Sequence, residues 1–317
     1  MGSWTPEFVM SNTAIPSGIG LTSRLRRGIF SQRPVVVVSA CFLIGLVLLA
    51  WIVPVLSPYG AEQGGDAQFS PPDLSHWFGT DVHGRDLFTR VFAGARISLL
   101  VGVVGTSVSL LIGVSWGMVA GYFGGRLDGL LMRIVDILYS LPGIVLVIVL
   151  ITTLEPTVKA VAASSAPSLG RLVRVVFLFI GLGAVSWLTM ARIIRGQVLS
   201  LRTRSFVLAS RALGAGPLRI LRRHIFPNVV GITVVYLTLT VPAIILYESF
   251  LSYLGLGIQP PEASLGTLIA EGAGEINPLQ INWWLVVCPG AVLSATLLAL
   301  SFVGDGLKNA LDPKSSG

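Results

Sequence analysis

Hydrophobic residues gather along this chain in long blocks, which are separated by polar segments rich in charge, glycine and proline. A membrane-spanning helix needs about 20 mostly apolar residues, and several of these blocks reach that length. They predict six spans, at residues 34–56, 97–122, 131–153, 174–192, 229–256 and 283–304. Pro142 interrupts the third of these. The pattern therefore indicates an all-α integral membrane protein whose two termini lie on the same side.

The polar segments define the rest of the organisation. Residues 1–33 are interpreted as a cytoplasmic tail, without a cleavable signal because the block that follows is too long for one. Residues 57–95 are expected outside, carrying short helices. The core of five further spans, 96–306, contains a second outer connection at 154–173 and a basic stretch at 193–228. Residues 307–317 form a second cytoplasmic tail.

Basic residues set the orientation. With both termini inside, the inner segments hold 16 of the 22 lysines and arginines, counting those at helix ends. The predicted 5–6 loop has none but contains three glutamates. Because lysine and arginine concentrate in cytoplasmic loops, residues 57–95 and 257–281 are predicted outside and residues 193–228 inside.

Composition excludes several functional classes. The chain has 317 residues, of which 12% are charged, and a mean hydropathy of +0.81. The net charge of +7 is spread over the ends of apolar blocks, not gathered in one patch, so a nucleic acid partner is not expected. Cys41 and Cys288 have no partner at a metal-binding spacing and are interpreted as small core residues. We expect no metal or cofactor in this chain.

A stripe of small residues marks the second predicted span. Its members, which recur every four residues, are Gly105, Ser109, Gly113, Gly117 and Gly121. Such residues allow close helix approach in lipid, where no hydrophobic force drives helices together. We interpret the stripe as a helix-packing seam; the alternative is glycine tolerated without a partner helix.

The basic stretch is predicted to form a helix, a bend and a second helix. Thr203 or Ser205 could cap the first helix, Gly214 and Gly216-Pro217 would break it, and the second piece would stop at Pro227. The stretch could enter a groove on a partner or lie as an amphipathic connector on anionic lipid.

This stretch resembles the cytoplasmic "EAA" loop of ABC importer permeases. The residues at the motif positions are Ala209, Ser210, Arg211, Ala212, Gly214, Ile225 and Pro227. The sequence departs from the motif at Leu208, where the family has Glu, at Ser210, where it has Ala, and at Phe226, where it has Leu. The resemblance implies that these residues dock onto an ATPase subunit.

Further blocks are similar to dipeptide and oligopeptide permeases of the C type. They include the runs at 76–81, 94–99, 120–125, 132–136, 251–261 and 304–313, in order. The resemblance implies a type I importer permease fold in the cell inner membrane and a peptide substrate, although similar permeases carry nickel chelates or glutathione. The implied partners are a second permease, two cytoplasmic ATPases that bind ATP and Mg, and an extracytoplasmic binding protein.

Two acidic residues lie in or beside predicted spans. Asp136 follows Arg133 by three residues, so the two share a helix face and are predicted to pair. Glu248 lies in the outer half of the fifth span, and an intramembrane carboxylate usually faces a cavity or a partner group. It either belongs to the translocation pathway or a gate, or bonds to the turn at 251–257.

Other functions find less support in the sequence. No nucleophile–base pair, zinc motif or phosphate-binding loop is present, so we expect no enzyme activity and a separate source of ATP hydrolysis. A channel or receptor would work without an ATPase, which the loop at 193–228 argues against.

Overall fold

The computed structural model describes residues 34–163, 167–258, 262–276 and 281–311, so the predicted N-terminal tail and most of the C-terminal one lie outside it. The described chain is helical, with one isolated bridge between Thr80 and Asp86 and no strand in these ranges. Its helices are α2 (Pro34–Leu56), α3 (Leu87–Phe123), α4 (Gly125–Tyr139), α5 (Gly143–Ala163), α6 (Pro167–Leu201), α7 (Ser205–Ala212), α8 (Pro217–Ile220), the π-helical turn η1 (Leu221–Ile225), α9 (Phe226–Tyr253), α10 (Leu265–Gly274) and α11 (Trp284–Leu311).

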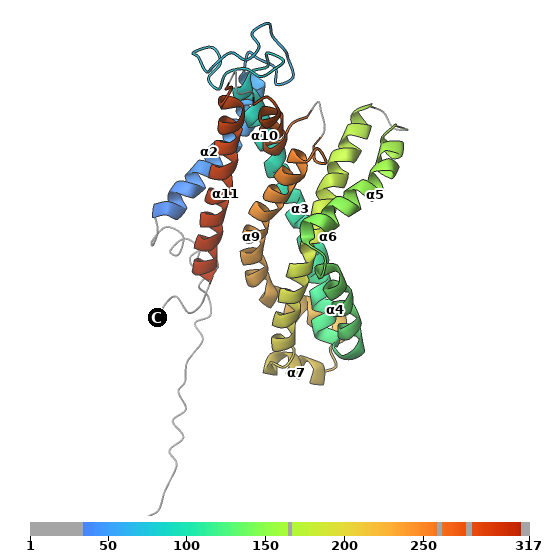
Figure 1. Cartoon of the computed structure of the whole chain (residues 1–317). Coiled ribbons are helices and arrows are strands. Elements are labelled where there is room, and N and C mark those ends of the chain that lie inside the picture. Colours follow the sequence, from blue (N-terminus) through green and yellow to red (C-terminus); the bar gives the residue numbers. More distant parts are fainter. Residues whose placement is uncertain (1–33, 164–166, 259–261, 277–280, 312–317) are drawn as a thin grey trace, which may run out of the picture.

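The helices form an elongated bundle (Figure 1). Helices α2 and α11 lie on one side and α4 to α6 on the other, with α3 and α9 between them. The irregular segment 57–86 covers one end of the bundle, and α7 lies at the opposite end. We call these the cap end and the α7 end.

Four of the described helical stretches are long and apolar enough to cross a membrane: 34–56, 87–123, 217–253 and 284–310. The pair α4 and α5 makes a fifth if a span may bend by 90° at its break, which lies beside Pro142. The predicted fourth span lies within α6. The structure thus agrees with a multi-span helical membrane protein without fixing the number of crossings at six.

Helix α3 starts ten residues before the predicted second span. Asp86 caps it by accepting a hydrogen bond from the N–H of Thr89, and Gly124, with φ of 66°, ends it. The first turns contain Arg90, which is buried. A hydropathy pattern assigns a charged residue such as Arg90 to a loop, because hydropathy does not show that another part of the chain pairs with the charge and buries it.

The short helices expected at 57–95 are absent from 57–86, where the described chain forms turns.

The predicted connection 154–173 is also mostly helical. Helix α5 continues to Ala163 and α6 begins at Pro167. Polar and charged residues in this region had suggested a loop, but both helices extend through them.

Candidate functional site

The predicted coupling stretch lies at the α7 end of the bundle (Figure 1). Helix α7 ends in a Schellman motif, in which the N–H of Ala215 bonds to the carbonyl of Ser210 and the N–H of Gly214 to that of Arg211. Gly214 has φ of 81°, and a side chain at this position would meet open space. The bend predicted from the sequence is therefore a glycine-dependent helix end.

The predicted boundaries of this stretch differ from the structure in two places. The capping residue of α7 is Arg204, without a side-chain bond, so neither Thr203 nor Ser205 caps the helix. The second piece does not stop at Pro227, which lies in the first turn of α9, where its missing N–H costs little. Just before it, the π-helical turn η1 bonds the N–H of Phe226 to the carbonyl of Leu221 and joins α8 to α9 without a break.

The inner face of the stretch packs onto α3 and α6. Val207, Ile220 and Ile225 are fully buried in one hydrophobic cluster. Residues of α3, α6 and α9 complete this cluster; its buried members from these helices are Val114, Tyr122, Met190, Ile194, Val198 and Val229. A displacement of α7 would therefore reach three long helices through close-packed side chains.

The outer face of the stretch is exposed and mixes apolar and basic side chains. Leu213 and Leu218 are 89% and 77% exposed. Of the motif residues, Ala209, Arg211, Ala212, Gly214 and Pro227 are exposed, Ser210 is half-buried and Ile225 is buried. Most of the residues predicted to dock onto an ATPase are thus accessible in the structure.

Ser210 makes a contact that the sequence did not suggest. Its Oγ lies 3.2 Å from Nε2 of His224, which belongs to η1. This bond ties α7 to the turn that leads into α9.

The small-residue stripe of α3 faces α6. A Cβ atom on Gly117 would lie 2.5 Å from the carbonyl oxygen of Ala191, and one on Gly121 would lie 2.9 Å from that of Arg195. A Cβ atom on Gly113 would lie 2.6 Å from Cβ of Met190 and 2.9 Å from the carbonyl oxygen of Trp187. The two backbones approach so closely that only glycine fits at these positions.

Two buried hydroxyls of α3 stand in this region without a partner. Within the described residues, Thr106 Oγ1 and Ser109 Oγ have no hydrogen-bonding group in reach. Ser109 thus belongs to the stripe through its small size.

Ion pairs link α4 to α6 near the α7 end. Asp136 pairs with Arg192 at 2.7 Å, not with Arg133 as predicted, because α6 brings Arg192 alongside. Asp128 forms a two-pronged pair with Arg195, whose Nη2 lies 2.7 Å from Oδ2. Both pairs join residues more than 50 positions apart, so local spacing could not identify them.

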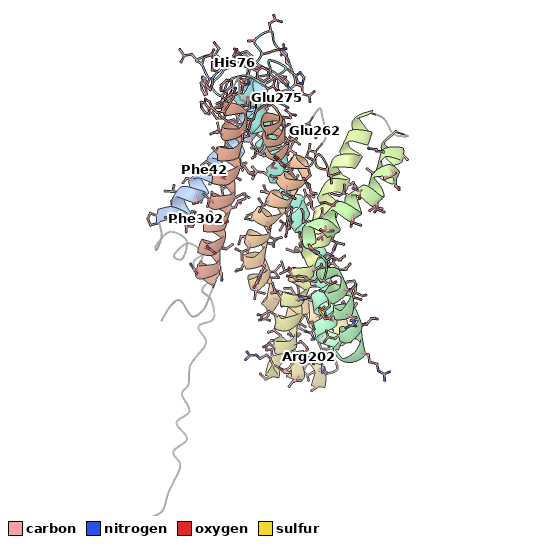
Figure 2. All side chains as sticks on the ribbon, viewed as in Figure 1. Phe42, His76, Arg202, Glu262, Glu275 and Phe302 are labelled. Atoms are coloured by element: carbon pink, nitrogen blue, oxygen red, sulfur yellow. The ribbon has the colours of Figure 1, made fainter. Side chains whose placement is uncertain are left out.

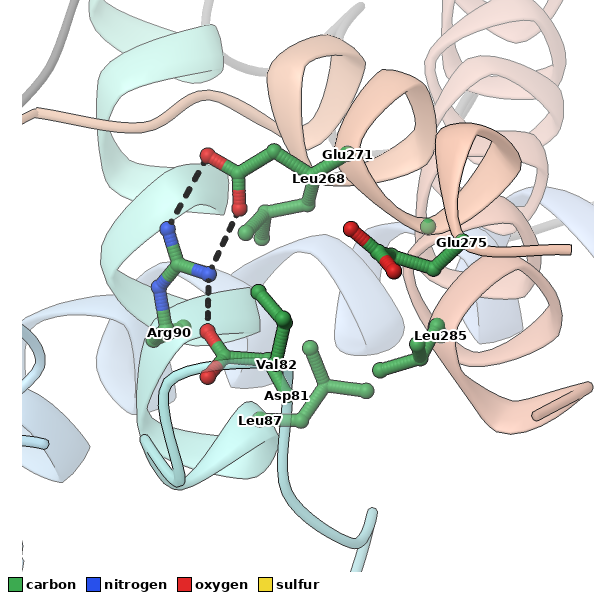
Figure 3. Close-up of a pocket in the computed structure, with 9 residues that line it drawn as sticks. Asp81, Val82, Leu87, Arg90, Leu268, Glu271, Glu275 and Leu285 are labelled. Atoms are coloured by element: carbon green, nitrogen blue, oxygen red, sulfur yellow. Dashed lines mark hydrogen bonds and ion pairs between the residues drawn. The ribbon is translucent and has the colours of Figure 1, made fainter. Parts of the chain in front are cut away.

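A buried ion-pair network holds the cap end together, and the sequence analysis missed it. Arg90 of α3 donates from Nη1 to Asp81 Oδ2 at 2.6 Å and to Glu271 Oε2 at 2.8 Å (Figure 3). Its side chain is 4% exposed. A small pocket with room for about one water molecule lies beside it. The network ties segment 57–86 to α3 and α10.

Asp81 is the most heavily bonded carboxylate of this network. Oδ1 accepts from the N–H groups of His83 and Arg85, and Oδ2 from both guanidiniums. Burial tends to raise the pKa of Asp81, but the backbone N–H of Arg85 and the charges of Arg90 and Arg85 outweigh it and hold that pKa below its usual value.

Charge is distributed unevenly between the two ends. Figure 2 shows Arg202 at the α7 end, with His76, Glu262 and Glu275 at the cap end. Phe42 of α2 and Phe302 of α11 lie on the flank, each about two-fifths exposed, as lipid-facing residues are. The arginine at the α7 end and the glutamates at the cap end follow the bias of lysine and arginine from which the orientation was predicted.

Glu248 is fully buried in α9. Ser252 Oγ lies 2.6 Å from Oε1 and Ser98 Oγ lies 3.3 Å from Oε2. The carboxyl group therefore bonds to Ser98 of α3 and to Ser252 in the last turn of α9 rather than facing a cavity in this structure.

A family model described as the binding-protein-dependent transport system inner membrane component matches residues 113–317. The dipeptide transport system permease protein DppC of Bacillus subtilis (strain 168) is 45% identical over 273 residues, which cover 86% of this chain and 79% of that protein. The oligopeptide transport system permease protein OppC of Escherichia coli (strain K12) is 41% identical over 288 residues, covering 90% and 89%.

Among solved structures, the chain resembles an inward-facing conformation of the MetNI methionine ABC transporter. The TM-score is 0.53 at 20% identity, and the match covers 71% of this chain and 98% of that one. This likeness establishes a shared fold, that of a type I ABC importer permease.

Proposed function

Because the chain belongs to the family of binding-protein-dependent transport system inner membrane components, as a membrane permease of an ABC importer, we propose that it moves di- or oligopeptides across the cytoplasmic membrane. Relatives with 36–45% identity are named as dipeptide or oligopeptide permeases, which supports this class of cargo. Nickel chelates and glutathione are the alternative cargoes.

The same proposal assigns the α7 end to energy coupling. The supporting observation is the combination of an exposed outer face and a buried inner face in the stretch 205–225. An ATPase subunit docks on the outer face, and its movement passes through Val207, Ile220 and Ile225 to α3, α6 and α9. The complete importer contains a second permease, two ATPases and an extracytoplasmic binding protein, with both termini of this chain in the cytoplasm.

Replacement of Gly214 by Trp tests the coupling role. A Trp at φ of 81° is strained, and its indole would project from the proposed docking face. We expect the permease to insert normally, while copurification of the ATPase subunits and peptide uptake both fall at least tenfold, the effect of about 1.4 kcal/mol in binding.

Gly255→Trp provides the matched control. Gly255 has φ of 77°, and a Cβ atom there would meet open space, as at Gly214, but Gly255 follows α9 near the cap end. ATPase recovery should stay at the wild-type level in this variant. Wild-type ATPase recovery and uptake in Gly214→Trp would favour the alternative, that the stretch is a lipid-surface connector.

The cargo class is tested separately. Uptake of a labelled dipeptide and a labelled pentapeptide should be competed by unlabelled peptides and not by glutathione or a nickel chelate. Identification of the binding protein that copurifies with the complex gives a second test, since that protein selects the cargo. Competition by glutathione alone would contradict the peptide proposal.

A further inference from the structure

Glu248 is the end point of two hydrogen-bond chains that begin at the first turn of α10. In the first chain the N–H of Leu265 donates to Ser98 Oγ at 3.2 Å, and Ser98 Oγ lies 3.3 Å from Glu248 Oε2. In the second, the N–H of Thr267 donates to Ser264 Oγ at 3.2 Å, Ser264 Oγ donates to Ser252 Oγ at 3.3 Å, and Ser252 reaches Glu248 Oε1. The two chains join α10 to α3 and α9.

The direction of the second chain is fixed by counting donors and acceptors. Ser252 Oγ accepts from the N–H of Ile258 and from Ser264 Oγ, which occupies both of its lone pairs. Its own proton therefore goes to Glu248 Oε1, 2.6 Å away. Without an acceptor at Oε1, a buried hydroxyl donor is left unsatisfied, which costs about 1–3 kcal/mol.

The start of α10 is also packed backbone against backbone. A Cβ atom on Gly266 would lie 2.7 Å from the carbonyl oxygen of Ser249, and one on Gly94 would lie 3.1 Å from the carbonyl carbon of Ser264. The first turn of α10 therefore packs closely against both α3 and α9, beside the serines that bond to Glu248. At its other end, Glu271 of α10 joins the Arg90 network.

We propose that Glu248 is a positioning residue, which fixes α10 between α3 and α9 by accepting these two hydrogen-bond chains, and that it does not contact the cargo. Its acceptor oxygen Oε1 is the essential feature. With Glu271 held by Arg90, α10 and segment 57–86 form one rigid outer end of the permease. The link to transport rests on the function proposed above, whereas the anchoring of α10 does not.

Hydrogen exchange of α10 amides in the purified, full-length permease complex tests the anchoring. In Glu248→Leu, which has similar size but no acceptor, we expect exchange of Leu265–Gly274 to rise roughly tenfold or more. In Glu248→Gln the amide oxygen still accepts from Ser252, so exchange should stay within about threefold of wild type. The α3 segment 105–121 should be unchanged in both variants, which shows that the bundle is folded.

A milder pair of variants on α3 supplies a matched control. Ser98 and Ser109 are both buried, but only Ser98 bonds to α10, whereas no partner for Ser109 Oγ is found in the described structure. Ser98→Ala should therefore raise α10 exchange, and Ser109→Ala should leave it unchanged.

Peptide uptake separates the anchor from a cargo-binding role. An anchor predicts that Glu248→Leu lowers maximal uptake and that Glu248→Gln restores it, with the half-saturating peptide concentration unchanged. A raised half-saturating concentration in Glu248→Gln, together with normal α10 exchange, would mean contact with the cargo and would overturn the proposal. Wild-type α10 exchange in Glu248→Leu, or equal loss in the Leu and Gln variants, would overturn it as well. If the permease carries no peptide, the exchange results still decide the anchoring.

Discussion

At the scale of single residues, the role of a charged side chain depends on what the fold brings to it. Arg90 and Arg202 both lie at helix ends in the structure, yet Arg90 is buried between two carboxylates while Arg202 donates to the carbonyl of Gly121. A buried guanidinium without its partners would be strongly destabilising. We therefore expect the Asp81–Arg90–Glu271 network to set the stability of the cap end.

The lowered pKa of Asp81 makes this stability depend on pH. Because the folded-state pKa lies below the unfolded value of about 3.9, the stabilisation is fully present above that value. It is lost as pH falls through the folded-state pKa. We expect hydrogen exchange in segment 57–86 to increase across that acid range relative to the α3–α6 seam.

Asp81→Asn checks this prediction. The amide keeps the size of the side chain but cannot ionise, so exchange in segment 57–86 should be faster than wild type at neutral pH and should lose its acid dependence. We expect the free energy of unfolding of the cap end to fall by about 1–3 kcal/mol, because a neutral amide replaces the charged acceptor of the hydrogen bonds from the two arginines. An acid dependence equal to that of wild type would assign it to another carboxylate.

At the scale of elements, the contact between α3 and α6 is the most extensive in the bundle. It depends on residues without side chains, since Gly113, Gly117 and Gly121 place α3 directly on the backbone of α6. Packing of this kind is typical of helices in lipid. The α3–α6 contact also connects the α7 end to the middle of the bundle, because Ile194 and Val198 of α6 belong to the hydrophobic cluster that contains Val207 of α7.

Gly117→Leu should disrupt this contact. Its Cβ would meet the carbonyl oxygen of Ala191 at 2.5 Å and Ile194 Cβ at 2.9 Å, so the helices must separate. We expect a loss of about 1–3 kcal/mol or more, measured as a lower thermal unfolding temperature of the complex and a lower yield. Gly231→Leu on α9, where a side chain meets open space within this chain, is the control. A Gly117→Leu variant with wild-type stability would show that α6 can shift without cost.

At the scale of the whole molecule, the two ends differ in structure and charge. The cap end consists of segment 57–86, α10 and the Arg90 network, with exposed acidic residues, while the α7 end is arginine-rich. This polarity supports an orientation with the cap outside and α7 inside, following the distribution of basic residues in membrane proteins.

Cysteine labelling tests this orientation at two highly exposed positions. Leu74 in segment 57–86 is 96% exposed and Leu213 beside α7 is 89% exposed. In a variant with Cys41 and Cys288 replaced by Ser, we expect a membrane-impermeant thiol reagent on intact cells to label Leu74→Cys and not Leu213→Cys. Both should react after the membrane is opened. The opposite pattern in intact cells would reverse the orientation.

The multi-span helical membrane class and the small-residue stripe could be predicted from the sequence, because both depend on composition and spacing along one chain. The family was predicted from the resemblance of its sequence motifs to those of known permeases. Hydropathy needs no knowledge of neighbours, and glycines every four residues define a helix face before its partner is known.

Helix packing was needed to show that α6 meets that face, that Asp136 pairs with Arg192, and that Arg90 belongs to a buried helix start. The structure also showed Glu248 bonded to two serines beneath α10, which the sequence had left between a cargo or gate role and a turn contact. The physical reason is common to these cases, because the role of a charged or polar group depends on its partner. Helix packing brings together partners that lie 56, 150 and 181 residues apart in the pairs Asp136–Arg192, Ser98–Glu248 and Arg90–Glu271.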